Sequence, residues 1–192
     1  MFRMHYRGRT SGSVTELPSG PTLRKMLCGN VVGITCASLT FIMLLTGILS
    51  DYWLVNFGKD LFHQGIWQQC TKNLCHRLTG IAFLDATRGL LICSTAFLLF
   101  GILFSCLTFL SYHVGKVTAS LAAAAVETLS AVFLIIGMAV YTGNTSDRVL
   151  NNSYNYQWSF FLCWASALTS ILAVISHILA HTVSPIPGYE SV

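Results

Sequence analysis

Charged residues are scarce in this chain of 192 amino acids, because 11 Lys and Arg and 7 Asp and Glu make up only 9% of it. An average soluble domain carries about 25% charged residues, so these few could not cover the surface of a soluble protein of this size. The chain also lacks a nucleotide-binding glycine loop, paired carboxylates, and a Ser-His-Asp or Cys-His arrangement in a polar segment. We therefore expect no enzymatic activity and no cofactor.

The basic residues do not form a nucleic-acid-binding surface. The formal net charge is +4, but the Lys and Arg residues are scattered, and five of the eleven precede the first apolar run. These five are Arg3, Arg7, Arg9, Arg24 and Lys25. This distribution favours contact with an anionic membrane surface over nucleic acid.

Long apolar runs are abundant, in a chain that is 54% hydrophobic. They approach the length of about 20 residues that crosses a bilayer, and they predict a multi-pass membrane protein surrounded by lipid. The predicted spans are 27–49, 88–110, 117–141 and 158–180, within one unit at 27–181. Asp85 and Arg88, three residues apart at the start of the second span, are expected to pair at the membrane boundary.

The charges beside the first span predict the orientation of the chain. Residues 1–26 are polar and basic and are expected to form a disordered tail, Arg24 and Lys25 directly precede the span, and Asp51 follows it. The local excess of Lys and Arg places the N-terminus in the cytosol. Four spans then place the tail at 182–192 in the cytosol as well, and the loops at 50–87 and 142–157 outside.

Two sites in the second outer loop match the acceptor pattern for N-glycans. They are Asn144-Thr-Ser and Asn151-Asn-Ser. Asn151 is the better candidate, because Asn144 follows the predicted third span so closely that the membrane would hinder its modification.

The seven cysteines divide into two groups. Five lie within or at the edge of apolar runs, where a free Cys behaves as a small hydrophobic residue. Cys70 and Cys75 share the first outer loop, where an oxidising compartment favours a disulfide that contributes about 2 kcal/mol through so short a closed loop. The alternative is a zinc site that adds His63 and His76 to the two cysteines.

Glu127 is a charged residue inside the third predicted span. A charge at the centre of a membrane costs about 2.5–3.5 kcal/mol on insertion scales. Glu127 is therefore expected to face the bundle, to be protonated, or to bond a hydroxyl of another span. Such hydroxyls are offered by Thr40, Thr46 and Thr95. A packing bond between spans is the simpler interpretation, and a proton or ion path is the alternative, although the predicted spans contain no second acidic residue to continue one.

His177 and His181 lie four residues apart at the end of the fourth span, so that they could share a metal ion. The simpler interpretation leaves both neutral at the membrane interface, where a protonated His would favour the C-terminus of a helix. We expect no metal site here.

A pattern of residues in and after the first outer loop resembles a known superfamily. The pattern consists of Trp53, Gly65-Ile66-Trp67, Cys70, Cys75 and Arg88. It is similar to that of the claudin, peripheral myelin protein and epithelial membrane protein superfamily, over about residues 27–181. The resemblance implies an α-helical membrane protein with a left-handed bundle of four transmembrane helices and a small extracellular antiparallel β-sheet. It further implies that tryptophan of the pattern is buried between sheet and bundle, and that the disulfide ties neighbouring strands.

The short spacing between the paired cysteines departs from that of true claudins. The segment from His63 to Cys70, with its close Cys75, and the segment 139–143 are more similar to the lens-fibre and peripheral-myelin branches of the superfamily. This departure argues against a paracellular pore or barrier.

The C-terminal residues resemble a sorting signal of lysosomal membrane proteins. Gly188, Tyr189 and Val192 match its G-Y-x-x-Φ pattern, which is similar to the end of the granule-protein branch of the superfamily. A tyrosine and an apolar residue three apart in an extended chain can fill two pockets of a clathrin adaptor as an added strand. A PDZ ligand ending in Glu190-Ser-Val is the weaker alternative.

Three functions remain open at this point. The protein could organise membrane contacts or domains through its outer sheet and through lateral association with itself or with related four-span proteins. It could act in trafficking or exocytosis from endolysosomal or granule membranes. It could also be an auxiliary subunit of an ion channel. The corresponding locations are the plasma membrane for the first, and late endosomes, lysosomes or granules for the second.

Overall fold

The structure is a computed structural model that describes residues 20–58, 61–72, 74–110, 113–114, 117–151 and 153–183. Within these ranges, four helices are long and apolar enough to cross a membrane. They are α1 (Gly20–Leu49), α2 (Ala82–Leu107), α3 (Ala119–Leu150) and α4 (Trp158–Val183). A 3-10 turn, η1 (Thr108–Leu110), and a hairpin of β5 (His113–Val114) and β6 (Val117–Thr118) lie between α2 and α3.

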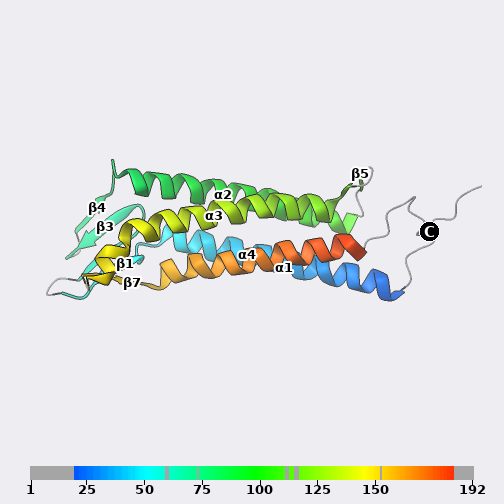
Figure 1. The fold of residues 1–192 in the computed structure, drawn as a ribbon, viewed down its shortest axis with the longest axis horizontal. Helices are drawn as coiled ribbons and strands as arrows, with labels where there is room; N and C mark the ends of the chain where they lie inside the picture. Colours follow the sequence, from blue (N-terminus) through cyan, green and yellow to red (C-terminus); the bar gives the residue numbers. More distant parts are fainter. Residues whose placement is uncertain are drawn as a thin grey trace, which may run out of the picture.

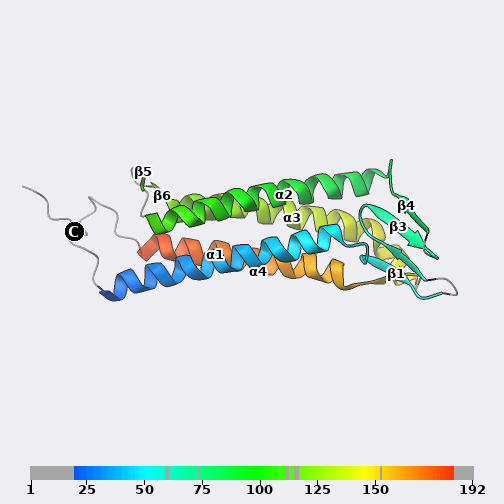
Figure 2. The ribbon, with the colours of Figure 1, turned by 180° about the vertical axis from the view of Figure 1, so that it is seen from behind.

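The helices pair in the bundle as α1 with α4 and α2 with α3 (Figure 1). A β-sheet lies at one end of the bundle, which we call the sheet end, and Figure 2 shows the same arrangement from behind. Helix α1 begins and α4 ends at the opposite end, which we call the terminal end. The alternating directions of four helices thus bring both outer loops of the prediction to the sheet end.

Small residues let the helices approach closely. Ala119, Ser120, Ala123 and Ala124 are buried on the side of α3 that faces the bundle. In α1, a Cβ added at Gly29 would lie 3.1 Å from the Cβ of Ala180 in α4. Lipid chains are as apolar as the helices, so close packing rather than hydrophobic contrast holds membrane helices together.

The described residues of the two outer loops form one five-stranded antiparallel sheet in the order β4-β3-β2-β1-β7. Its strands are β1 (Leu54–Asn56), β2 (Phe62–Gln64), β3 (Gln68–Thr71), β4 (Leu74–Arg77) and β7 (Asn155–Tyr156). Strand β7 comes from the second loop and pairs with β1 through Leu54 and Tyr156. The four-span membrane fold with a small antiparallel sheet, expected from the family resemblance, is therefore confirmed.

The helices extend beyond the predicted spans. Helix α1 begins at Gly20 inside the predicted tail, α2 begins at Ala82, and α3 continues to Leu150 inside the second predicted loop. A predicted span gives the apolar length that crosses the membrane, and a helix can continue beyond it because its backbone hydrogen bonds do not depend on lipid. Asp85 supports the early start of α2, since an acidic side chain in the first turn interacts favourably with the helix dipole.

Candidate functional site

Trp53 lies at the centre of the contact between the sheet and the bundle. Its side chain is fully buried, and its indole N–H donates a hydrogen bond of 2.8 Å to the carbonyl of Gly47 near the end of α1. Its ring meets Tyr141 of α3 edge to face, with the centroids 4.7 Å apart. The last carbonyls of a helix have no partner within it, and a buried indole N–H needs one. A single side chain thus satisfies both groups and holds the start of β1 against α1 and α3.

Trp67 bonds the neighbouring carbonyl at the end of α1. Its indole N–H donates to the carbonyl of Ile48 over 2.9 Å, and the residue remains 37% exposed, in contrast to the fully buried Trp53. The indole N–H groups of the two tryptophans therefore donate to the carbonyls of consecutive residues near the end of α1. The expected burial between sheet and bundle is complete for Trp53 and partial for Trp67.

Gly65 allows the turn between β2 and β3 to lie directly on the chain that leaves α1. A Cβ added there would lie 2.7 Å from the Cα of Asp51 and 2.8 Å from the carbonyl oxygen of Ser50. No side chain fits in this space. The next residue, Ile66, is fully buried in the core that the sheet shares with the bundle.

Arg88 joins α2 to this turn. Its Nε donates to the carbonyl of Ile66 over 2.7 Å, one terminal nitrogen donates to the carbonyl of Leu78 over 2.6 Å, and the other forms the expected ion pair with Asp85. Its guanidinium carbon also lies 5.3 Å from the centroid of the Trp67 ring, within the range of a cation–π contact. The planar group with several fixed donors satisfies two backbone carbonyls that strand pairing leaves free.

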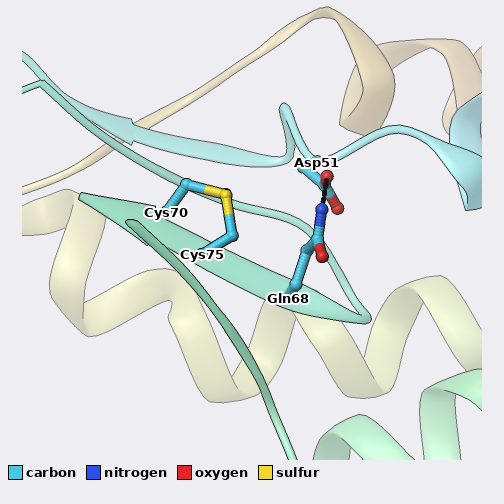
Figure 3. The surroundings of a disulfide bond; sticks show 4 residues. All are labelled: Asp51, Gln68, Cys70 and Cys75. Atoms are coloured by element: carbon cyan, nitrogen blue, oxygen red, sulfur yellow. Dashed lines mark hydrogen bonds between the residues drawn. A yellow bond between two sulfur atoms is a disulfide. The ribbon is translucent and has the colours of Figure 1, made fainter. Parts of the chain in front are cut away.

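The structure joins Cys70 and Cys75 by a disulfide between directly opposed positions of β3 and β4, with the Cα atoms 4.1 Å apart. Figure 3 shows this bond close to a second tie, in which the side-chain amide of Gln68 in β3 donates to the carboxylate of Asp51. The disulfide closes the outermost hairpin of the sheet, and the amide contact holds that hairpin to the end of α1.

The structure favours the disulfide over the alternative zinc site in this loop. A disulfide leaves neither cysteine as the thiolate that zinc binds. His63 instead stacks on Tyr52, with the ring centroids 4.6 Å apart. No group of three or more His, Cys, Asp or Glu that could hold a metal occurs anywhere in the part of the chain that the structure describes.

Trp53, Gly65, Trp67 and Arg88 together fix the sheet to the bundle, and we call this contact the joint. A comparison with protein families shows to which family the chain belongs. The model of the PMP-22/EMP/MP20/Claudin family matches residues 26–179, which include every residue of the joint. The chain belongs to this family. Its geometry gives each residue of the pattern a physical role at the contact between sheet and bundle.

Individual members of the PMP-22/EMP/MP20/Claudin family are similar over most of their length. Lens fiber membrane intrinsic protein of Homo sapiens is 27% identical over 156 residues, which cover 79% of this chain and 90% of the relative. Protein NKG7 of Bos taurus is 28% identical over 164 residues, which cover 81% of this chain and 93% of the relative. The human Protein NKG7 is 26% identical over 162 residues. The resemblance to the lens-fibre and granule-protein branches of the family is thereby confirmed.

The two predicted glycosylation sites lie in different surroundings in this family member. Asn151 is exposed directly after α3, at its C-terminal cap, and Ser153 of its acceptor pattern is exposed too. Asn144 is also exposed but lies within α3, where its amide donates to the carbonyl of Val140, and Ser146 of its acceptor pattern donates to the carbonyl of Gly143 in the same helix. The structure therefore offers Asn151 more openly to a modifying enzyme. The sorting pattern at Gly188, Tyr189 and Val192 lies outside the described residues.

Glu127 faces the interior of the bundle, as expected, but the predicted hydroxyl partners were wrong. Its Oε1 accepts a hydrogen bond of 3.2 Å from Ser105 of α2 and lies 3.5 Å from His177 Nε2 of α4. Thr40 bonds Thr169 of α4 instead. The two other candidates donate to carbonyls of their own helices, Thr46 to Ile42 and Thr95 to Leu91.

His177 and His181 do not share a ligand. His177 is fully buried and faces Glu127, whereas His181 is half-buried and its Nδ1 bonds the hydroxyl of Thr118. The expectation that His177 sits at the interface was wrong. A helical pattern could have revealed this, because His177 continues the buried positions Ser166, Ser170 and Ala173 along one side of α4, and buried polar residues in membrane helices face the bundle.

Proposed function

We propose that this protein organises membrane contacts or membrane domains through its outer sheet and by side-by-side association, without catalysing a reaction. The observation that supports this most directly is the combination of a rigidly mounted sheet with an exposed apolar rim. Trp53, Trp67 and Arg88 fix the sheet to α1 and α2 through hydrogen bonds to backbone carbonyls. A sheet held in this way presents its far edge at a constant angle to the membrane.

Three apolar residues form that far edge, which we call the distal rim: Phe57, Leu61 and Leu74. The register pairs Asn56 with Phe62 and Thr71 with Leu74 at the end of the sheet away from the bundle, and the rim residues lie in or next to this row. They are 69%, 53% and 68% exposed. Apolar side chains that protrude into water at the tip of a protein often mark a surface for another macromolecule.

A vesicle assay tests the contact function. Purified protein reconstituted with its sheet outside should draw liposomes into clusters, and the double variant Phe57→Ser and Leu74→Ser should leave them dispersed. A matched control is Leu103→Ser, which removes a residue of similar exposure (60%) from the lipid-facing side of α2. If wild-type liposomes stay dispersed and crosslinking in cells finds only monomers, the proposal is wrong.

A role in trafficking from endolysosomal or granule membranes is the second candidate. It is supported by the Gly188, Tyr189 and Val192 pattern in the sequence. Under this hypothesis, Tyr189→Ala moves a tagged protein from internal vesicles to the cell surface. Tyr189→Phe is the control, because it keeps the aromatic ring that Tyr189→Ala removes. An unchanged distribution at cell contacts with all three forms would exclude a sorting function of the tail.

A further inference from the structure

A cluster of three polar side chains and two glycines, to which all four helices contribute, lies inside the terminal half of the bundle. It consists of Glu127 of α3, His177 of α4 and Ser105 of α2, together with Gly33 of α1 and Gly101 of α2. The three polar side chains are completely buried. The proposed contact function makes no use of this cluster, because the sheet lies at the other end of the molecule.

The three polar side chains form a closed triangle of short contacts. Ser105 Oγ lies 2.9 Å from His177 Nε2 and 3.2 Å from Glu127 Oε1, and the latter two atoms are 3.5 Å apart. The second oxygen of the carboxyl, Glu127 Oε2, and the second nitrogen of the imidazole, His177 Nδ1, have no hydrogen-bond partner among the described residues. Buried polar groups are normally paired, so this site departs from ordinary packing.

Two glycines make room for these side chains. A Cβ added at Gly101 would lie 2.6 Å from Glu127 Cγ, and one added at Gly33 would lie 2.6 Å from two atoms of the His177 ring. Larger residues at either position would push the acid or the base out of place. The space for the pair is therefore built by the backbones of α1 and α2.

The cluster lies nearer to the terminal end than to the sheet end, because Glu127 is close to the start of α3 and His177 is close to the end of α4. Ala37, Leu98 and Ala173 form a separate apolar cluster, each lying three or four residues from a member of the site in the direction of the sheet. Towards the terminal end, Ser120 donates to the side-chain oxygen of Asn30 over 2.9 Å. The terminal end is therefore the nearer source of a proton for this site.

Few ionisable groups surround the pair. Helix α3 contributes Glu127 and α4 contributes His177, while α1 and α2 face them with the uncharged Gly33, Gly101 and Ser105. One turn beyond His177, the imidazole of His181 is held by Thr118. The charge of the site is therefore set by the acid and the base themselves.

We propose that Glu127 and His177 form a proton-binding site that holds one proton between the carboxyl and imidazole groups. The proton moves between Glu127 Oε1 and His177 Nε2, directly or through the Ser105 hydroxyl. A neutral acid beside a neutral imidazole and a carboxylate beside an imidazolium both sum to zero charge. A second proton makes the site positive and the loss of the only proton makes it negative, and an unpaired charge is costly in this interior.

This site links helix packing to the proton concentration at the terminal end. With one proton present, the triangle draws α2, α3 and α4 together. When the proton is lost or a second one is bound, the uncompensated charge loosens the contacts in this half of the bundle. The sheet end, beyond the apolar cluster, keeps its packing.

Nuclear magnetic resonance of the wild-type protein in lipid nanodiscs tests the proton count. The full chain contains three glutamates, Glu16, Glu127 and Glu190, so carboxyl labelling gives three signals, and Glu127→Gln assigns one of them. At neutral pH we expect either a protonated Glu127 with a neutral His177, or a carboxylate with an imidazolium. A carboxylate beside a neutral imidazole, a net charge of minus one, would overturn the proposal.

Thermal unfolding of two single variants gives a second test, in which the two melting temperatures should change with pH in opposite directions. Glu127→Gln leaves an imidazole that becomes a lone cation at low pH, so the melting temperature should fall as the pH falls. His177→Gln leaves a carboxyl that becomes a lone anion at high pH, so the melting temperature should fall as the pH rises. The double variant should remove both slopes. The melting temperatures are compared from about pH 4 to about pH 9.

A matched control separates charge from packing. Ser94 of α2 and Ser130 of α3 each donate to the backbone carbonyl of the other, and Ser130→Ala removes one of these two neutral hydrogen bonds. It should lower the melting temperature equally at every pH. The proposal is wrong if the melting temperatures of both single variants change with pH in the same direction. It is also wrong if the melting temperatures of all variants change with pH as that of the wild type does. In sealed, uniformly oriented liposomes the NMR signals should follow the pH on the terminal side, and a response restricted to the sheet side would also refute the proposed site.

Discussion

The Nε of Arg88 in α2 lies 2.7 Å from the carbonyl oxygen of Ile66, a residue 22 positions earlier in the chain. This contact joins the second span to the turn between β2 and β3, and the same guanidinium bonds Leu78 and Asp85 and lies over Trp67. The family pattern in the sequence therefore describes a joint, in which the sheet and the bundle share one set of hydrogen bonds.

Replacing Arg88 by Lys should weaken this joint. A lysine keeps the charge but has no planar fork to reach two carbonyls and a carboxylate at once. Hydrogen bonds of charged groups contribute about 1.5–3 kcal/mol each, so the free energy of unfolding should fall by about 2 kcal/mol or more. Thermal unfolding in nanodiscs measures this loss. Arg77→Lys on the exposed strand β4 is the control and should leave the melting temperature unchanged.

Replacing Cys75 by Ser should open the outermost hairpin. The closed loop is short, so the disulfide contributes about 2 kcal/mol in the chain-entropy account. Because the bond lies between β3 and β4, we expect partial retention inside the cell and faster proteolysis of this hairpin. Cys93→Ser, at an exposed free cysteine of α2, is the control. Normal export and protease resistance of Cys75→Ser would show that the disulfide is dispensable.

Glycosylation should occur at Asn151 and not at Asn144. Asn151 is exposed just beyond the end of α3, whereas Asn144 is bonded within the helix. Asn151→Gln should therefore abolish the mobility shift that glycosidase treatment causes in the wild type, and Asn144→Gln should keep it. The opposite result would mean that modification precedes the folding of this end of α3, and an absent shift in all forms would contradict the predicted orientation.

Two glycines of α2 should respond to alanine in opposite directions. At Gly101 the new Cβ would lie 2.6 Å from Glu127 Cγ, and overpacking of this kind costs about 1–3 kcal/mol. At Gly89 nothing lies within 4 Å, so Gly89→Ala should stabilise the helix by about 0.5–1 kcal/mol. The difference between the two melting temperatures is the measured quantity. Equal effects would mean that the close packing of α2 against Glu127 is not needed.

The sequence determined the membrane class, the number of spans, the family and the residues of its pattern. These features are local: an apolar run has a length, flanking charges have a sign, and Trp53, Gly65 and Arg88 have a fixed order. Lengths of helices beyond the membrane were harder to predict, because Gly143 and Asn144 in α3 suggested a loop although backbone bonding continues to Leu150.

Only the tertiary structure decided which polar residues meet. Glu127 and His177 are 50 positions apart, and their contact depends on the rotation of α3 and α4 about their axes and on the space left by Gly33 and Gly101. Likewise, no local pattern shows that Trp53 and Trp67 bond successive carbonyls at the end of α1. Apolar spacing predicts which side of each helix faces inward, but the partner of a buried polar group is set by how four helices pack together, because close packing leaves room for a single arrangement.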